Sequence, residues 1–240
     1  MFLDRFRYEL RIMGKWVVLI PVLMIFACVV LAALLTLMHV APLRISQVLT
    51  ASLEMVLPLS AGVVLATIAS HDAAIELQLT LPKTYRVTAL GRLVLITVWS
   101  GAIALFASVF IYHLKFWRIP SQVASWTVLP QFLIGQLTWV APLLWFVAIG
   151  LCLALLLRSR SASSALLGGI WTAEAIFYSL FATTDWLKPV FLFPTTLDPG
   201  IDFWLINRLA LIGTALVLLV AGWFLLARTE LLLQGTAGEE

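Results

Sequence analysis

The sequence predicts an all-α integral membrane protein, built as one transmembrane domain over residues 1–240. Hydrophobic residues make up 62% of the chain and charged residues only 11%, whereas soluble domains carry about 25% charged residues. A chain this apolar needs lipid as its solvent, and about 20 consecutive apolar residues cross a bilayer as a helix. The polar stretches between the apolar ones leave no room for a soluble domain of ordinary size.

Six stretches have the length and apolar character of transmembrane helices. In chain order they cover residues 16–38, 48–70, 93–112, 132–157, 162–183 and 209–227. The first follows a basic stretch, as a signal peptide does, but its apolar run is longer than the roughly 7–15 residues of a signal-peptide core. We therefore expect residues 16–38 to be the first transmembrane helix and not a cleaved leader.

The segment before the first span is predicted to form an amphipathic elbow helix over residues 2–13. Its apolar residues fall at helical spacing, and its charged residues occupy the other faces; the latter include Arg5, Arg7, Glu9 and Arg11. Such a helix lies in the membrane interface. Two roles fit the pattern, an anchor on the lipid surface or an elbow that also contacts a cytoplasmic partner.

Residues 71–92 form the longest loop expected on the cytoplasmic side. Asp72 is a suitable N-cap for a short helix, Pro82 ends that helix, and a second helix is expected to run from about Thr84 into the third span. A plain connector needs only a few residues. The length and the internal helix boundary favour a working cytoplasmic element over a plain connector.

Residues 183–208 form the longest segment expected on the outer side. The segment is apolar between its charges, and Pro189, Pro194 and Pro199 interrupt it too often for a spanning helix. We expect short helices in the outer leaflet or a re-entrant pair against the bundle. The final residues, 234–240, are a polar tail of the kind that is usually disordered.

The distribution of basic residues predicts the orientation. With a cytoplasmic N-terminus, ten of the 15 Lys and Arg residues lie in the inner segments and five in the outer segments. Cytoplasmic loops of membrane proteins carry the excess of Lys and Arg. Both termini are therefore predicted to lie in the cytoplasm, and the net charge of +3 reflects topology and not nucleic-acid binding.

Two carboxylates fall inside apolar stretches, and intramembrane ionisable residues are candidate functional sites. Glu174 is near the middle of the fifth stretch, and Glu54 is in the outer half of the second. Each is a candidate polar point on a substrate path. The alternative for both is a hydrogen-bonded lock between helices, with Gln131, Gln136 or Thr172 as possible partners, and Glu54 could also reach the interface by snorkelling.

Motifs of membrane enzymes and ATPases are missing from the sequence. It contains no His-Glu-x-x-His zinc motif and no Gly-x-x-x-x-Gly-Lys-Ser/Thr loop, and no Gly-x-Ser-x-Gly turn. Cys28 and Cys152 lie inside apolar stretches, where packing is the expected role. Gly168 and Gly169 are expected to mark close helix packing. No metal ligand set and no catalytic residue is predicted.

The order of these parts resembles the type-2 ABC transporter permeases, the membrane subunits of ABC exporters with short loops. The resemblance covers the whole chain in architecture: an elbow helix, six spans, and a proline-broken outer segment before the last span. The local motif lies after the second span, where an acidic residue and apolar residues precede Leu-Pro and a basic helix. In this chain the matching residues are Glu76, Leu77, Leu81, Pro82, Lys83 and Arg86.

The resemblance implies partners and a location. It implies a separate ATP-binding subunit that holds ATP and Mg²⁺, so that this chain binds no cofactor itself, and a second permease subunit, either a copy or a sister chain. The loop around residues 76–86 would act as the coupling helix, and the elbow helix would dock beside it. The expected location is the inner membrane of a prokaryotic cell, and the expected activity is ATP-driven export by alternating access.

Other classes of function remain open at this point. A membrane-embedded enzyme that acts on lipid or peptide, or an ion-coupled carrier, would use Glu174. An assembly or scaffold protein and a secondary transporter subunit are further alternatives, although no internal repeat is visible of the kind that many secondary transporters show.

A charge reversal in the predicted coupling loop tests its role. Glu76→Lys, or deletion of Leu81 and Pro82, is expected to uncouple ATP hydrolysis from transport, because the loop would no longer transmit movement of the ATPase to the bundle. Insertion into the membrane is expected to stay normal. Transport assays on membrane vesicles measure the effect, and unchanged transport in both variants would exclude a coupling role for this loop.

Overall fold

The computed structural model describes residues 15–70 and 82–226, and every regular element in these two ranges is helical. Five helical stretches are long and apolar enough to cross a membrane: Leu19–Leu37, Pro42–Ala69, Arg86–His113, Val128–Leu157 and Trp204–Leu225. The chain is thus an all-helical protein with the character of a multi-pass membrane protein. The expected elbow helix over residues 2–13 lies outside the described residues, as does the tail over residues 234–240.

The stretch expected as the fifth span, residues 162–183, is divided into two helices. α9 covers Arg160–Ile176 and α10 covers Tyr178–Thr183, with Phe177 at the junction in a non-helical conformation (φ −97°, ψ 25°). The 17 residues of α9 are fewer than the roughly 20 that span a hydrocarbon core. A single unbroken helix over residues 162–183 is therefore not present.

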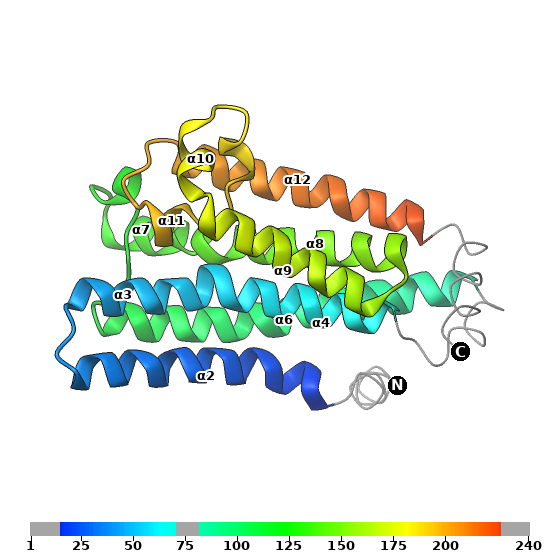
Figure 1. Ribbon diagram of the computed structural model, residues 1–240, viewed down its shortest axis with the longest axis horizontal. Helices are drawn as coiled ribbons and strands as arrows, with labels where there is room; N and C mark the ends of the chain where they lie inside the picture. The colour runs from blue at the N-terminus through cyan, green and yellow to red at the C-terminus, as the bar shows by residue number, and fades with distance from the viewer. Residues whose placement is uncertain (1–14, 71–81, 227–240) are drawn as a thin grey trace.

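The long helices run up and down along one axis, as Figure 1 shows. α2 (Lys15–Leu37) begins at the same end of the bundle at which α4 (Leu57–Ser70) ends, α6 (Pro82–His113) begins and α12 (Trp204–Leu225) ends. We call this the proximal end. At the opposite, distal end the chain between α10 and α12 folds over the bundle.

α8 (Leu137–Leu157) lies at the centre of the bundle, between α4 and α12. Its contact with α4 is closest at two glycines. A Cβ atom on Gly150 would lie 2.7 Å from the carbonyl oxygen of Gly62, and one on Gly62 would lie 2.8 Å from the carbonyl oxygen of Phe146. Two helix backbones approach this closely only where neither residue carries a side chain.

A π-helical turn interrupts the second long helix. α3 (Pro42–Ala51) continues into η1 (Ser52–Val56), where the N–H of Leu57 donates to the carbonyl of Ser52, and then into α4. Pro58 explains the wide turn, because it has no N–H to donate to the carbonyl of Glu54 and its ring clashes with that group in a regular α-helix. Glu54 therefore lies on a π-bulge, a feature that is frequent at functional sites.

Short elements connect the long helices at the distal end. η2 (Ser121–Val123) and α7 (Val128–Gly135) lie between α6 and α8, and η3 (Lys188–Val190) and α11 (Pro194–Leu197) lie between α10 and α12. Of the residues expected to form a re-entrant segment, 183–208, Thr183 ends α10 and residues 204–208 belong to α12. We call residues 184–203 the distal segment.

The start of the third long helix and the packing at Gly168 and Gly169 both differ from the sequence predictions. The third span is continuous with the helix expected before it, but α6 begins at Pro82 and not near Thr84. The expected close packing at Gly168 and Gly169 is wrong within this chain, since no atom lies within 4 Å of a Cβ placed on either residue. The close helix contact belongs to Gly62 and Gly150.

Substitution at the α4–α8 contact tests this packing. Gly150→Ala places a methyl group against backbone, which cannot move out of the way as a flexible side chain can, and overpacking of this kind costs about 1–3 kcal/mol. We expect a lower thermal unfolding midpoint in detergent. Gly213→Ala in α12 is the matched control, because no atom lies within 4 Å of its Cβ and alanine favours the helix; equal midpoints for the two variants would contradict the contact.

Candidate functional site

A buried carboxylate from the second long helix caps the short helix of the distal segment. Glu54 is fully buried, and it accepts hydrogen bonds from the backbone N–H groups of Thr195 (3.0 Å) and Thr196 (2.6 Å). Pro194, at the first position of α11, has no N–H. The N–H groups of Thr195 and Thr196 are therefore the first donors of this helix that need a partner. The side chain of Glu54 therefore does for α11 what an N-cap residue does within one chain segment.

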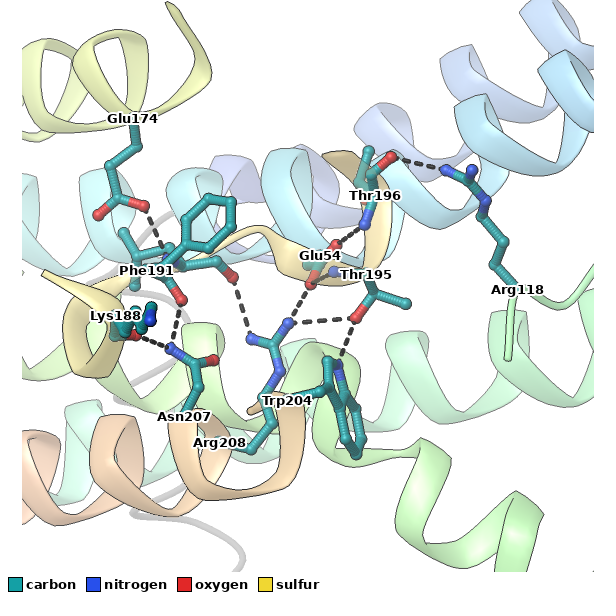
Figure 2. A network of polar contacts seen from close by, with 11 residues as sticks. Glu54, Arg118, Glu174, Lys188, Phe191, Thr195, Thr196, Trp204, Asn207 and Arg208 are labelled. Carbon is teal, nitrogen blue, oxygen red and sulfur yellow. Dashed lines mark hydrogen bonds and ion pairs between the residues drawn. The ribbon is translucent and has the colours of Figure 1, made fainter. Parts of the chain in front are cut away.

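Arg208 of α12 completes this site from the opposite side (Figure 2). Its side chain is fully buried, and its Nη2 atom forms an ion pair with Glu54 Oε1 and a hydrogen bond of 3.2 Å to Thr195 Oγ1. Its Nη1 atom donates to the carbonyl of Leu192 at 3.0 Å. One guanidinium thus links α12, the π-bulge and the distal segment.

Two neighbours of Arg208 on α12 hold the same segment. Asn207 donates through Nδ2 to the carbonyls of Lys188 (2.7 Å) and Phe191 (2.8 Å). Trp204 donates through its indole N–H to Thr195 Oγ1 at 2.8 Å. The first turn of α12 therefore presents three side chains to the distal segment, and all three are buried.

Glu174 of α9 contacts the same segment from a third helix. Only 3% of its surface is exposed, and it accepts a hydrogen bond of 2.7 Å from the N–H of Leu192. None of the partners expected for it, Gln131, Gln136 and Thr172, bonds to it. Gln131 donates to the carbonyls of Val123 and Ala124, and Gln136 bonds with Ser108 and Trp139. The interpretation of Glu174 as a lock is supported, but it locks a loop and not a neighbouring helix.

Apolar contacts surround these hydrogen bonds. Phe191, Leu192 and Phe193 of the distal segment are fully buried, and the ring of Phe193 lies 6.4 Å from Trp171 and 6.3 Å from Phe146, centroid to centroid. The distal segment is thus inserted into the bundle, and side chains in place of water satisfy its backbone groups, as a low-dielectric environment demands.

A cation lies at the rim of the buried cluster. Arg118, in the loop after α6, donates to the carbonyl of Thr196 at 2.6 Å. Partial burial lowers the pKa of this guanidinium, and the negative charge of Glu54 opposes that effect. Arg118 therefore adds a second guanidinium beside the buried pair of Glu54 and Arg208.

The structure leaves the predicted coupling residues untested. Glu76, Leu77 and Leu81 lie outside the described residues, as do Arg5, Arg7, Glu9 and Arg11 of the expected elbow. Pro82 and Lys83 begin α6 at the proximal end. Arg86, one turn further, stacks on the ring of Trp223 in α12, with 5.8 Å from its guanidinium carbon to the ring centroid.

The expectation that Glu54 snorkels to the interface is wrong, because its side chain has no exposed surface. The sequence reasoning missed its partner. The sequence places Arg208 in the outer segment, because the last apolar stretch begins at residue 209. In the structure α12 begins earlier, at Trp204, and includes Arg208. A signal was present: a carboxylate inside an apolar helix needs a counter-charge, and Arg208 directly precedes the last apolar stretch.

The cluster is built to hold a chain segment. Both oxygens of Glu54 and one oxygen of Glu174 accept hydrogen bonds from backbone or guanidinium groups. Among the described residues, no group of three His, Cys, Asp or Glu side chains has the arrangement of a metal site.

Comparison of the chain with protein-family models, curated proteins and solved structures finds no match.

Removing one partner of the ion pair tests the role of this cluster. Arg208→Met leaves Glu54 as an unpaired buried charge, and such a loss costs about 3–5 kcal/mol. We expect a strongly lowered unfolding midpoint, partly restored in the double variant Glu54→Gln/Arg208→Met, because the double variant carries no unpaired charge. Asp185→Asn is the control: it breaks the exposed pair with Lys188, which is expected to leave stability unchanged. No restoration in the double variant would contradict the charge argument.

Proposed function

We propose that this chain is the transmembrane subunit of an ATP-driven ABC transporter, an exporter that pairs with a separate ATP-binding subunit and with a second permease subunit. In this proposal α9 and α10 together make the sixth pass through the membrane. The proximal end is cytoplasmic, the distal end is external, and the distal segment is re-entrant.

One observation carries the proposal, namely that side chains of several helices hold an irregular segment at the distal end of the bundle. At the distal end, three N–H groups and four carbonyls of the distal segment bond to side chains of the surrounding helices and loops; they belong to Leu192, Thr195 and Thr196, and to Lys188, Phe191, Leu192 and Thr196. A membrane path sealed at one end by an inserted segment is what a transporter needs in its inward-facing state.

The proposed mechanism uses the attachment of the distal segment to three helices. Glu54 on η1, Glu174 on α9 and Arg208 on α12 all hold it, so that movement of α12 relative to α4 must displace the segment or break its bonds. Alternating access requires two states of which a ligand or partner favours one. ATP-driven movement at the proximal end supplies that bias, and opening at the distal end is its consequence.

The proximal end offers a place for the motor subunit. α4 ends and α6 begins at this end, and the residues that resemble a coupling helix, from Glu76 to Arg86, lie between or at these two helix ends in the sequence. The cation–π contact between Arg86 and Trp223 ties the start of α6 to α12. A push on the loop would therefore reach the helix that carries Arg208.

The geometry gives little support to the alternative in which Glu174 serves an intramembrane enzyme or an ion-coupled carrier. A catalytic carboxylate needs a face open to its substrate. Glu174 is buried and bonded to the N–H of Leu192, which favours a structural role. The variant Glu174→Gln distinguishes the structural role from a role in proton transfer. Its amide oxygen can still accept from the N–H of Leu192, but the amide cannot exchange a proton.

Purification of the chain from its native membrane in mild detergent, with mass spectrometric identification of the proteins that accompany it, tests the proposal. We expect a soluble-type subunit that carries a Gly-x-x-x-x-Gly-Lys-Ser/Thr loop and hydrolyses ATP. Asp185→Lys, a charge reversal at the distal end, is the control for Glu76→Lys: only the latter is expected to reduce recovery of the ATPase. Recovery of the chain alone, or only with unrelated membrane proteins, would overturn the proposal.

A further inference from the structure

A groove runs between α2 and α6 on the side of the bundle away from the distal segment. Its volume is about 530 Å³, and its walls are apolar side chains, among them Val22 and Phe26 of α2 and Ile103, Phe106 and Phe110 of α6. Ser52 is the polar residue of the lining, and its hydroxyl donates to the carbonyl of Leu49 in its own helix. The groove therefore offers hydrocarbon and no free hydrogen-bonding group.

A second pocket, with one Lys and one His in its lining, lies where α6 ends and the following loop begins. The pocket, of about 390 Å³, is lined by Tyr112, His113, Lys115, Trp117 and Ile119. His113 and Lys115 are exposed. The carboxyl end of α6 itself bears partial negative charge, so attraction of an anion must come from the Lys115 ammonium, with the His113 and Tyr112 side chains as further hydrogen-bond donors.

The groove and the pocket follow one another along α6. His113 lies seven residues beyond Phe106 and three beyond Phe110, which puts all three on one stripe of the helix. His113 of the pocket thus lies on the stripe of α6 that lines the groove, at the level at which α6 leaves its apolar stretch. Trp117 beside Lys115 suits the headgroup level, where tryptophan is enriched.

We propose that this groove and pocket bind one anionic phospholipid from the leaflet at the distal end, with an acyl chain along α2 and α6 and the phosphate at Lys115 and His113. The charge pattern matches such a molecule, since one end of the site is cationic and the rest is apolar. The inference goes beyond transport and does not depend on an ATPase partner.

The groove is a poor surface for a second copy of the chain. Helices associate in lipid through small residues that allow close backbone approach. Here bulky side chains stand out from both walls: Phe106 is 77% exposed, Phe26 63% and Phe110 51%. A flexible acyl chain fills the hollow between such side chains, whereas a rigid helix face leaves it empty.

Native mass spectrometry of the full chain in detergent tests this site, with three probes: phosphatidylglycerol, phosphatidylcholine with the same acyl chains, and glycerol phosphate without acyl chains. We expect one phosphatidylglycerol to be retained in preference to phosphatidylcholine, and no binding of glycerol phosphate. Lys115→Ala is expected to weaken retention about fivefold, the effect of one basic residue near an anionic headgroup. His113→Ala/Lys115→Ala is expected to abolish the preference between the two lipids.

A groove-filling variant with a matched control decides whether the lipid occupies this place. Ala102 lines the groove and Ala221 lies on the lipid-facing side of α12, and both are exposed. Ala102→Trp is expected to abolish retention of both lipids, and Ala221→Trp to leave it unchanged. Equal retention in the two tryptophan variants would overturn the proposal, as would binding of glycerol phosphate alone. A third outcome is that Ala102→Trp converts a dimer to a monomer and leaves lipid retention unchanged. That result would assign the groove to an interface between two copies of the chain, and it would also overturn the lipid proposal.

Discussion

The buried ion pair between Glu54 and Arg208 is the constraint on which the distal half of the structure depends. Neither side chain has exposed surface, and a buried charge is tolerated only when it is paired and its remaining hydrogen-bonding capacity is used. Both oxygens of Glu54 and both Nη atoms of Arg208 bond to each other or to the distal segment, while the buried Nε atom of Arg208 has no hydrogen-bond partner. The position of α12 against the π-bulge and the path of residues 188–196 between them are therefore fixed together, and neither is stable without the other.

The same requirement explains how a proline-broken segment lies inside an apolar bundle. Pro189, Pro194 and Pro199 prevent a long helix, so most backbone groups of the distal segment have no partner within the segment. In lipid, irregular backbone is tolerated only where protein groups satisfy it. The side chains that bond to these backbone groups include Asn207, Arg208, Glu54 and Glu174. This is why these buried polar side chains lie together at one place in an otherwise apolar bundle.

The sequence predicted the helical class and the approximate spans because apolar length is a local property. It also pointed to Glu54 and Glu174 as unusual residues. It missed Arg208 because the boundary of an apolar stretch hides a charge that tertiary packing buries, and it missed the α4–α8 contact because Gly62 and Gly150 lie 88 positions apart. Partners distant along the chain leave no local pattern: Glu54 bonds to Thr195, 141 residues later, and no periodicity in either segment records that.

The attachment of three helices to one segment sets the cost of deforming the distal end. Side chains of η1, α9 and α12 are joined through the distal segment, so separation of any two helices there exposes a carboxylate or a guanidinium to an apolar interior. Breaking a buried ion pair by removing one partner costs about 3–5 kcal/mol. Because Arg208 lies on α12, which Arg86 at the start of α6 also contacts through the ring of Trp223, a force on the start of α6 reaches the helix that carries this pair. The distal end therefore opens only when the free energy acting on α12 exceeds that cost.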